Sequence, residues 1–228
     1  MKNMKLTKTS LLLLSFFSAI GCGLNVELEE PLSVRLSPEA DTFLNGNSDV
    51  NVDKKQLNLY TWPDYTRANT ILMKFDIPDL KGRTVKKATL HLYLTEATHT
   101  WCSDPTPEEY RVVVNKVINF KPNLSVASGE TYDGTNPCTA CTLCNNTTYS
   151  IADNDFKGPY DTKILDQNLG WKEWDVTEMV QEWGDAPSTN YGLTLFSDET
   201  KTQNCQRIFA SSEHDEQGKR PYLTLEAE

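Results

Sequence analysis

The chain has 228 residues and a formal net charge of -10, from 22 Lys and Arg against 32 Asp and Glu. This length allows one large domain with a substantial core. The excess of acidic residues disfavours binding to nucleic acids and to anionic lipid surfaces. A polyanionic ligand would need a local basic patch or a bridging cation, and any other ligand is expected to be neutral.

The first 21 residues have the features of a signal peptide. Three lysines precede an apolar run at 11–17, which is shorter than the roughly 20 residues of a membrane span. The run leads into Ser18-Ala19-Ile20-Gly21-Cys22, a pattern that resembles the lipobox of bacterial lipoproteins. In that motif the cysteine is diacylated and becomes the mature N-terminus. The alternative is an ordinary secreted protein that is cleaved at another position.

Lipidation at Cys22 has consequences for location and charge. Residues 1–21 contain three lysines and no acidic residue, so their removal moves the formal charge from -10 to -13. Gly23, rather than Asp, follows the cysteine, which resembles an outer-membrane sorting signal. We therefore expect a cell-envelope protein, anchored only through its lipid in the outer membrane or at the cell surface, with residues 22–32 as an acidic tether.

Alternation of apolar and polar residues with a period of two dominates residues 33–228. The clearest example is the run from Ala88 to Leu94, in which every second residue is apolar. Short strands are predicted at 56–60, 71–75, 88–94, 111–118, 171–175, 192–196, 207–211 and 222–226. Many short strands separated by turn residues favour an all-β domain, an antiparallel, jelly-roll-like β-sandwich.

One short helix interrupts the strands. Asp175 is predicted to cap it, with Glu178 completing a capping box three residues later. The apolar residues that follow have helical spacing and are expected to face the core: Val176, Met179, Val180 and Trp183. Gly184 and Pro187 end the helix.

Residues 119–170 are rich in Asn, Thr, Asp and Gly and show no clear alternation. A stretch of this length without strands is typically functional or partly disordered. We predict an insertion loop here, stapled by cysteines at its centre.

Four stretches of the chain resemble the DNRLRE-type domain, also classed as carbohydrate-binding module family 96. They occur in the order of that family and span about residues 38–228: 40–44 (ADTFL), 72–78 with 85–94 (LMKFDIP and VKKATLHLYL), 174–183 with 190–193 (WDVTEMVQEW and NYGL), and 209–213 with 220–225 (FASSE and RPYLTL). The resemblance implies a sandwich module that binds polysaccharide, with alginate the best-known ligand class.

The remaining cysteines suggest disulfides. An exported protein meets an oxidising compartment, and five thiols remain once Cys22 is acylated, so at least one has no intramolecular partner. We predict one bond between Cys102 and Cys205 and a second between Cys138 and Cys144. The spacing Cys138-x-x-Cys141-x-x-Cys144 also leaves a metal or redox site open.

Aromatic and hydrogen-bonding side chains suited to sugar rings form two candidate binding groups. Alternation places the first group away from the core, on a sheet face if their strands are neighbours: Lys74, His91, Tyr93, Arg207 and Tyr222. Trp62 and Arg67 form the second group, in a loop. Each of these residues singly is also compatible with an ordinary solvated sheet position.

A structural calcium ion is a further possibility, because sandwich modules of this kind often hold one at a loop. Four oxygen-bearing side chains cluster before the first predicted strands: Asp41, Asn45, Asn47 and Asp49. A solvated turn explains the same cluster. Calcium would also allow an acidic, uronate-type polysaccharide to bind; without it a neutral polysaccharide is expected.

No catalytic motif is recognisable. His91, His99 and His214 lie in none of the spacings typical of nucleophile or zinc chemistry. We therefore expect a non-catalytic, lipid-anchored polysaccharide-binding module. The alternative is a structural or adhesive envelope protein that binds a protein partner, with the 119–170 loop as its candidate binding segment.

Overall fold

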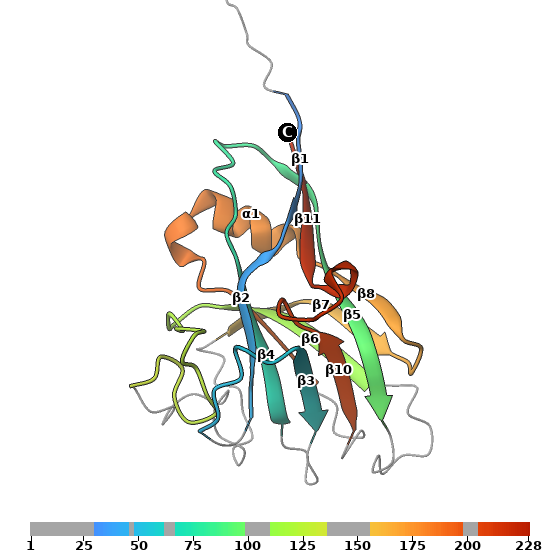
Figure 1. Cartoon of the computed structure of the whole chain (residues 1–228). Coiled ribbons are helices and arrows are strands. Elements are labelled where there is room, and N and C mark those ends of the chain that lie inside the picture. Colours follow the sequence, from blue (N-terminus) through green and yellow to red (C-terminus); the bar gives the residue numbers. More distant parts are fainter. Residues whose placement is uncertain (1–29, 46–47, 62–66, 99–109, 136–155, 198–204) are drawn as a thin grey trace, which may run out of the picture.

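The computed structural model describes residues 30–45, 48–61, 67–98, 110–135, 156–197 and 205–228 (Figure 1). Its strands are β1 (Leu32–Leu36), β2 (Pro38–Leu44), β3 (Gln56–Thr61), β4 (Arg67–Phe75), β5 (Val85–Thr98), β6 (Tyr110–Val117), β7 (Phe156–Leu165), β8 (Gly170–Asp175), β9 (Leu193–Ser197), β10 (Gln206–Ala210) and β11 (Tyr222–Ala227). The α-helix of the described part is α1 (Thr177–Asp185). The predicted all-β antiparallel sandwich with one short helix is confirmed.

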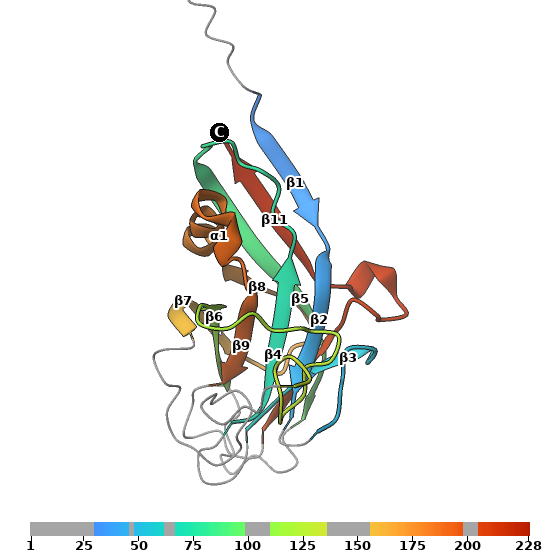
Figure 2. The same cartoon turned by 90° about the vertical axis from the view of Figure 1, so that its left-hand side faces the viewer.

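The strands form two layers of one curled antiparallel sheet (Figure 2). Sheet A contains β1, β11, β5, β10 and β3, with β8 on the other edge of β5. Sheet B contains β2, β4, β9, β6 and β7. The two meet at β4, whose first residues pair with β3.

Strand β5 organises sheet A. One of its edges pairs with β11 and then with β10, while its other edge pairs with β8. Residues 211–221 connect β10 to β11, so this segment leaves the sheet and returns along the same edge of β5. We call it the 211–221 turn.

The main core lies between the two sheets. Alternate residues of β5 (Ala88, Leu90, Leu92 and Leu94) point into it and are fully buried. From α1 the core receives Met179, Val180 and Trp183, three of the four residues of the predicted apolar stripe, and the fourth, Val176, is also buried there. Burial of each such side chain contributes about 2 kcal/mol.

The start of α1 differs from the predicted capping box. Strand β8 continues through Asp175, which pairs with Thr89, so the helix begins only at Thr177 with Val176 as its N-cap residue. No side-chain hydrogen bond forms at that N-cap. Asp175 instead accepts a hydrogen bond from the backbone N–H of Thr177, at 2.9 Å.

The prediction of a strand-free loop over 119–170 is wrong for 156–165, which form β7. This strand pairs with β6 at the edge of sheet B. Its sequence, FKGPYDTKIL, has Gly-Pro near its start and few apolar residues, so it gives no alternating pattern. Residues 136–155, with the cysteine trio, lie outside the described part.

Residues 118–135 cover the outer face of sheet B. A second apolar cluster forms there between sheet residues, including Leu72 and Phe196, and the covering residues Phe120 and Leu124. Tyr132 adds a ring contact to Phe120, with ring centres 4.8 Å apart. Sheet B is therefore apolar on both faces, and its outer face is occupied by the chain itself.

Candidate functional site

The outer face of sheet A carries a cluster of four aromatic rings. His91 and Tyr93 come from β5, Trp171 from β8 and Tyr222 from β11. Register explains their proximity, because His91 lies opposite Tyr222 on one side and Tyr93 lies opposite Trp171 on the other. We call these four residues the aromatic platform.

Trp171 lies perpendicular to the other three rings. The plane of the Trp171 ring makes angles of 84° with His91, 90° with Tyr93 and 74° with Tyr222. The corresponding distances between ring centres are 6.4, 5.3 and 5.0 Å. Trp171 thus contacts three neighbouring rings edge to face, and it remains 37 % exposed. This geometry gives the platform one large aromatic side chain that is both held in place and open to solvent.

The other rings are held more tightly. Tyr222 stacks on His91 with ring centres 4.2 Å apart, and the guanidinium of Arg35 lies 3.5 Å from the centre of the Tyr222 ring. Both faces of Tyr222 are therefore engaged, by a cation on one side and by an imidazole on the other. Lys219, from the 211–221 turn, lies 5.3 Å from the centre of the Tyr93 ring.

His91 is the buried member of the platform. Its Nε2 lies 3.2 Å from the hydroxyl of Thr224, and its Nδ1 lies 3.2 Å from a carboxylate oxygen of Glu173. Burial lowers the pKa of His91, with Glu173 acting in the opposite direction. The neutral ring is thus the form present at pH 7, where it supports Tyr222 rather than presenting a charge.

The structure brings together three of the predicted sugar-binding residues, His91, Tyr93 and Tyr222. Sequence reasoning missed Trp171, Arg35 and Lys219 as members of the site. The alternation pattern could have identified Trp171. Residues three apart in a strand point to opposite faces, and Trp174 is fully buried, so Trp171 must point outward. Arg35 and Lys219 depend on strand order and on a turn, which the pattern does not reveal.

Lys74 lies elsewhere. It belongs to β4 and pairs with Glu39 of β2, 2.5 Å away. Together with Lys121 and Asn123 it lines a cavity of about 550 Å³ beside the segment that covers sheet B. Lys74 is therefore not part of the aromatic platform.

The prediction that Arg207 points away from the core is wrong. Arg207 is fully buried, with its guanidinium 4.8 Å from the centre of the Tyr110 ring, and it donates hydrogen bonds to the carbonyls of Leu165 and Asp166. Ile208 and Phe209 are both apolar, so the sequence does not reveal which of them faces inward. Phe209 does, and Arg207, two residues before it, shares that side.

The second predicted sugar-binding group is not described. Trp62 lies outside the described residues. Arg67 begins β4, where it pairs with Thr61, but its side chain also lies outside the description. Their role stays a prediction.

The predicted calcium ligands are placed only in part. Asp41 is 1 % exposed, and its two carboxylate oxygens accept hydrogen bonds from the N–H (2.8 Å) and hydroxyl (3.0 Å) of Ser212. Asn45 Oδ1 lies 3.5 Å from the amide nitrogen of Asn51, Asp49 is exposed and Asn47 lies outside the described residues. In the described ranges no group of three or more His, Cys, Asp or Glu is arranged to hold a metal ion. Both carboxylate oxygens of Asp41 are therefore already used as acceptors for Ser212.

Among the predicted disulfide cysteines only Cys205 is described. It is 1 % exposed and disulfide-bonded. Its partner lies outside the described ranges, so its pairing with Cys102 stays a prediction, as does the pairing of Cys138 with Cys144.

Comparison with known proteins gives no relative: no family model matches the chain, and no curated protein matches it. Within the described ranges, no helix has the length and apolar character needed to cross a membrane.

Proposed function

We propose that this chain is a non-catalytic, lipid-anchored module that binds polysaccharide at the bacterial cell envelope, with the aromatic platform as its binding surface. The observation that carries the proposal is the placement of Trp171, which three other rings support while 37 % of it stays exposed. Sugar rings present apolar C–H faces, which pack well against an open aromatic side chain. A fixed ring loses little conformational freedom on binding.

The surroundings of the platform supply polar groups for hydroxyls. Arg35 and Lys219 offer donors at two of its sides, and Glu173 offers an acceptor. Sheet B presents no equivalent surface in its described part, because residues 118–135 cover its outer face. This asymmetry favours sheet A as the side that meets the polysaccharide.

Replacing Trp171 by alanine is expected to weaken polysaccharide binding at least tenfold, because it removes the exposed stacking surface. The mature full chain, in detergent, would be tested on a panel of neutral and acidic polysaccharides with and without calcium, followed by isothermal titration on those retained. Ile164→Ala is the matched control, since Ile164 is an exposed apolar residue on β7, 64 % exposed. It should bind like the wild type.

Two outcomes oppose the proposal. One is the absence of binding to any polysaccharide on the panel, and the other is equal binding by the wild type and Trp171→Ala. Equal melting temperatures would exclude unfolding as the cause of a loss. Capture of an envelope protein that depends on 119–170, without polysaccharide binding, would instead favour the adhesive alternative.

Replacing Cys22 by serine is expected to release the chain from the membrane fraction, because serine cannot carry the proposed thioether-linked lipid. Fractionation and intact-mass measurement check this result directly. Retention of the variant in the membrane fraction with an unchanged mass would contradict lipid anchoring through Cys22.

A further inference from the structure

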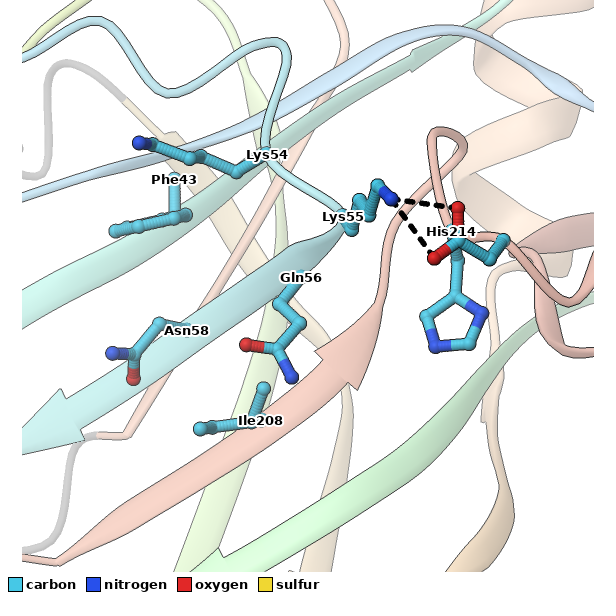
Figure 3. A pocket seen from close by; sticks show the side chains of 8 residues that line it. Phe43, Lys54, Lys55, Gln56, Asn58, Ile208 and His214 are labelled. Carbon is cyan, nitrogen blue, oxygen red and sulfur yellow. Dashed lines mark hydrogen bonds and ion pairs between the residues drawn. The ribbon is translucent and has the colours of Figure 1, made fainter.

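A second cavity opens on the outer face of sheet A, beside the 211–221 turn. Its volume is about 420 Å³, and its lining comes from four parts of the chain: Phe43, Lys54, Lys55, Gln56, Asn58, Ile208, His214 and Asp215. Figure 3 shows Gln56 and Asn58 side by side along one strand and Ile208 on the neighbouring strand. We call this cavity the β3–β10 pocket.

The floor of the pocket follows from strand register. Asn58 of β3 lies opposite Ile208 of β10, and both point away from the core that holds Leu57 and Phe209. Phe43 of β2 provides an aromatic wall. The pocket thus combines an apolar surface of two side chains with two primary amides, a combination that suits a ring with hydroxyls on its edge.

Asn58 is the lining amide whose polar atoms are not used by the described residues of the protein. Its Oδ1 is buried, yet no hydrogen-bond donor of the protein reaches it in the described part of the chain. Since that oxygen is closed to solvent, the group that Asn58 can offer to a bound molecule is its Nδ2, which is a donor.

The lining carries three charged groups, Lys54, Lys55 and Asp215, of which two form an ion pair. Lys55 is paired with Asp215, at 2.7 and 2.9 Å from the two carboxylate oxygens (Figure 3). This pair offers a donor and an acceptor side by side, which matches adjacent hydroxyls. The Nδ1 of His214 accepts the N–H of Glu216 at 3.1 Å, so a neutral His214 carries its proton on Nε2 and presents a donor there.

We infer that the β3–β10 pocket binds a single neutral sugar residue, such as the end of a glycan chain, in a site separate from the platform. The ring would pack on Phe43 and Ile208, and its hydroxyls would bond to Asn58, Gln56 and the Lys55–Asp215 pair. The two amides and the compensated Lys55–Asp215 pair suit an uncharged ring. The net negative charge of the chain disfavours an anionic one, and the lining opposes it only with the exposed Lys54. This inference rests on the lining of the pocket and does not need the platform to bind anything.

The test uses the mature full chain in detergent with D-glucose, D-galactose, D-mannose, N-acetyl-D-glucosamine and D-glucuronate as probes. Ligand-observed saturation-transfer NMR is expected to show saturable, millimolar binding of at least one of the four neutral sugars. Asn58→Ala should weaken that binding at least tenfold. No donor among the described residues reaches Asn58 Oδ1, so this change is not expected to unfold the protein.

Two further variants separate this site from the platform. Glu226→Gln, on the same outer face but away from the pocket, should bind the sugar like the wild type, and so should Trp171→Ala. The inference is overturned if no neutral sugar saturates, if only glucuronate binds, if Asn58→Ala binds normally, or if Trp171→Ala removes the binding. Failure of Trp171→Ala to affect polysaccharide binding would bear on the proposed function alone.

Discussion

Replacing Glu182 by alanine is expected to lower the free energy of unfolding by about 3 kcal/mol, because it removes the partner of a buried lysine. Glu182 lies in the last turn of α1 and reaches across to sheet B. One of its oxygens accepts hydrogen bonds from Lys116 of β6 and from the hydroxyl of Tyr160 of β7, both at 2.9 Å. The other oxygen pairs with Lys157.

The burial of Lys116 sets the size of this effect. Its side chain is 7 % exposed, whereas that of Glu182 is 26 % exposed. Without the carboxylate, the contact that remains to the ammonium among the described residues is with the hydroxyl of Thr189, at 3.5 Å. Breaking a buried pair from one side is strongly destabilising because the remaining charge is left in a poorly solvated position.

The pKa of Glu182 makes the same interaction visible as a pH dependence. Burial alone would raise this pKa, but the hydrogen bonds from Lys157, Lys116 and Tyr160 together lower it to about 2. Because the folded-state pKa lies below the ordinary value of 4.5, the stabilisation is fully present above pH 4.5 and is lost as the pH falls toward 2.

Urea unfolding at pH 7 and at pH 3 measures both effects. Glu178→Ala is the matched control, since it changes an exposed glutamate one turn earlier on the same helix, and its unfolding free energy should stay within about 0.5 kcal/mol of the wild type. A Glu182→Ala variant as stable as Glu178→Ala at pH 7 would show that the ion pairs contribute nothing.

Replacing Asp41 by asparagine is expected to remove a pH dependence of stability between pH 4 and pH 7. Burial raises the pKa of Asp41 to about 6, and the neighbouring Glu213 adds to the rise, while the two hydrogen bonds from Ser212 act against it. A folded-state pKa above the ordinary value of 3.8 means that the folded protein favours the protonated form. The stability contributed by this group is therefore fully present below pH 3.8 and is lost as the pH rises through 6.

Two pKa units correspond to about 3 kcal/mol. Asparagine does not titrate, so the unfolding free energy of Asp41→Asn relative to the wild type should rise by about that amount between pH 4 and pH 7. Urea unfolding at unit intervals of pH measures this difference. Asp76→Asn, in an exposed turn after β4, should follow the wild-type profile, and an Asp41→Asn profile parallel to the wild type would refute the assignment.

The direction of a strand side chain can be predicted from the sequence where apolar and polar residues alternate strictly. Residues 88–94 alternate without exception, so the outward direction of His91 and Tyr93 followed directly. At 207–209 the alternation is ambiguous, because Ile208 and Phe209 are both apolar. The prediction for Arg207 is wrong for that reason.

The alternation of apolar and polar residues does not predict contacts that depend on strand order. Arg35 meets Tyr222 because β1 pairs with β11, and the platform forms because β8 and β11 flank β5 on opposite edges. The β3–β10 pocket joins four separate segments, of which Lys54 and Asp215 are about 160 residues apart in sequence. Similarly, the role of 118–135 as a cover for sheet B arises from tertiary packing rather than from any periodicity.

The 211–221 turn has an implication for how this protein can change. It carries Lys219 to the platform and His214 to the pocket, and Ser211 and Ser212 fix its first residues through bonds to Lys54 and Asp41. The strands on either side of it, β10 and β11, both pair with β5. Substitutions or insertions beyond Ser212 can therefore reshape both sites together at little cost to the framework, which makes this one excursion the natural place for ligand preference to diverge.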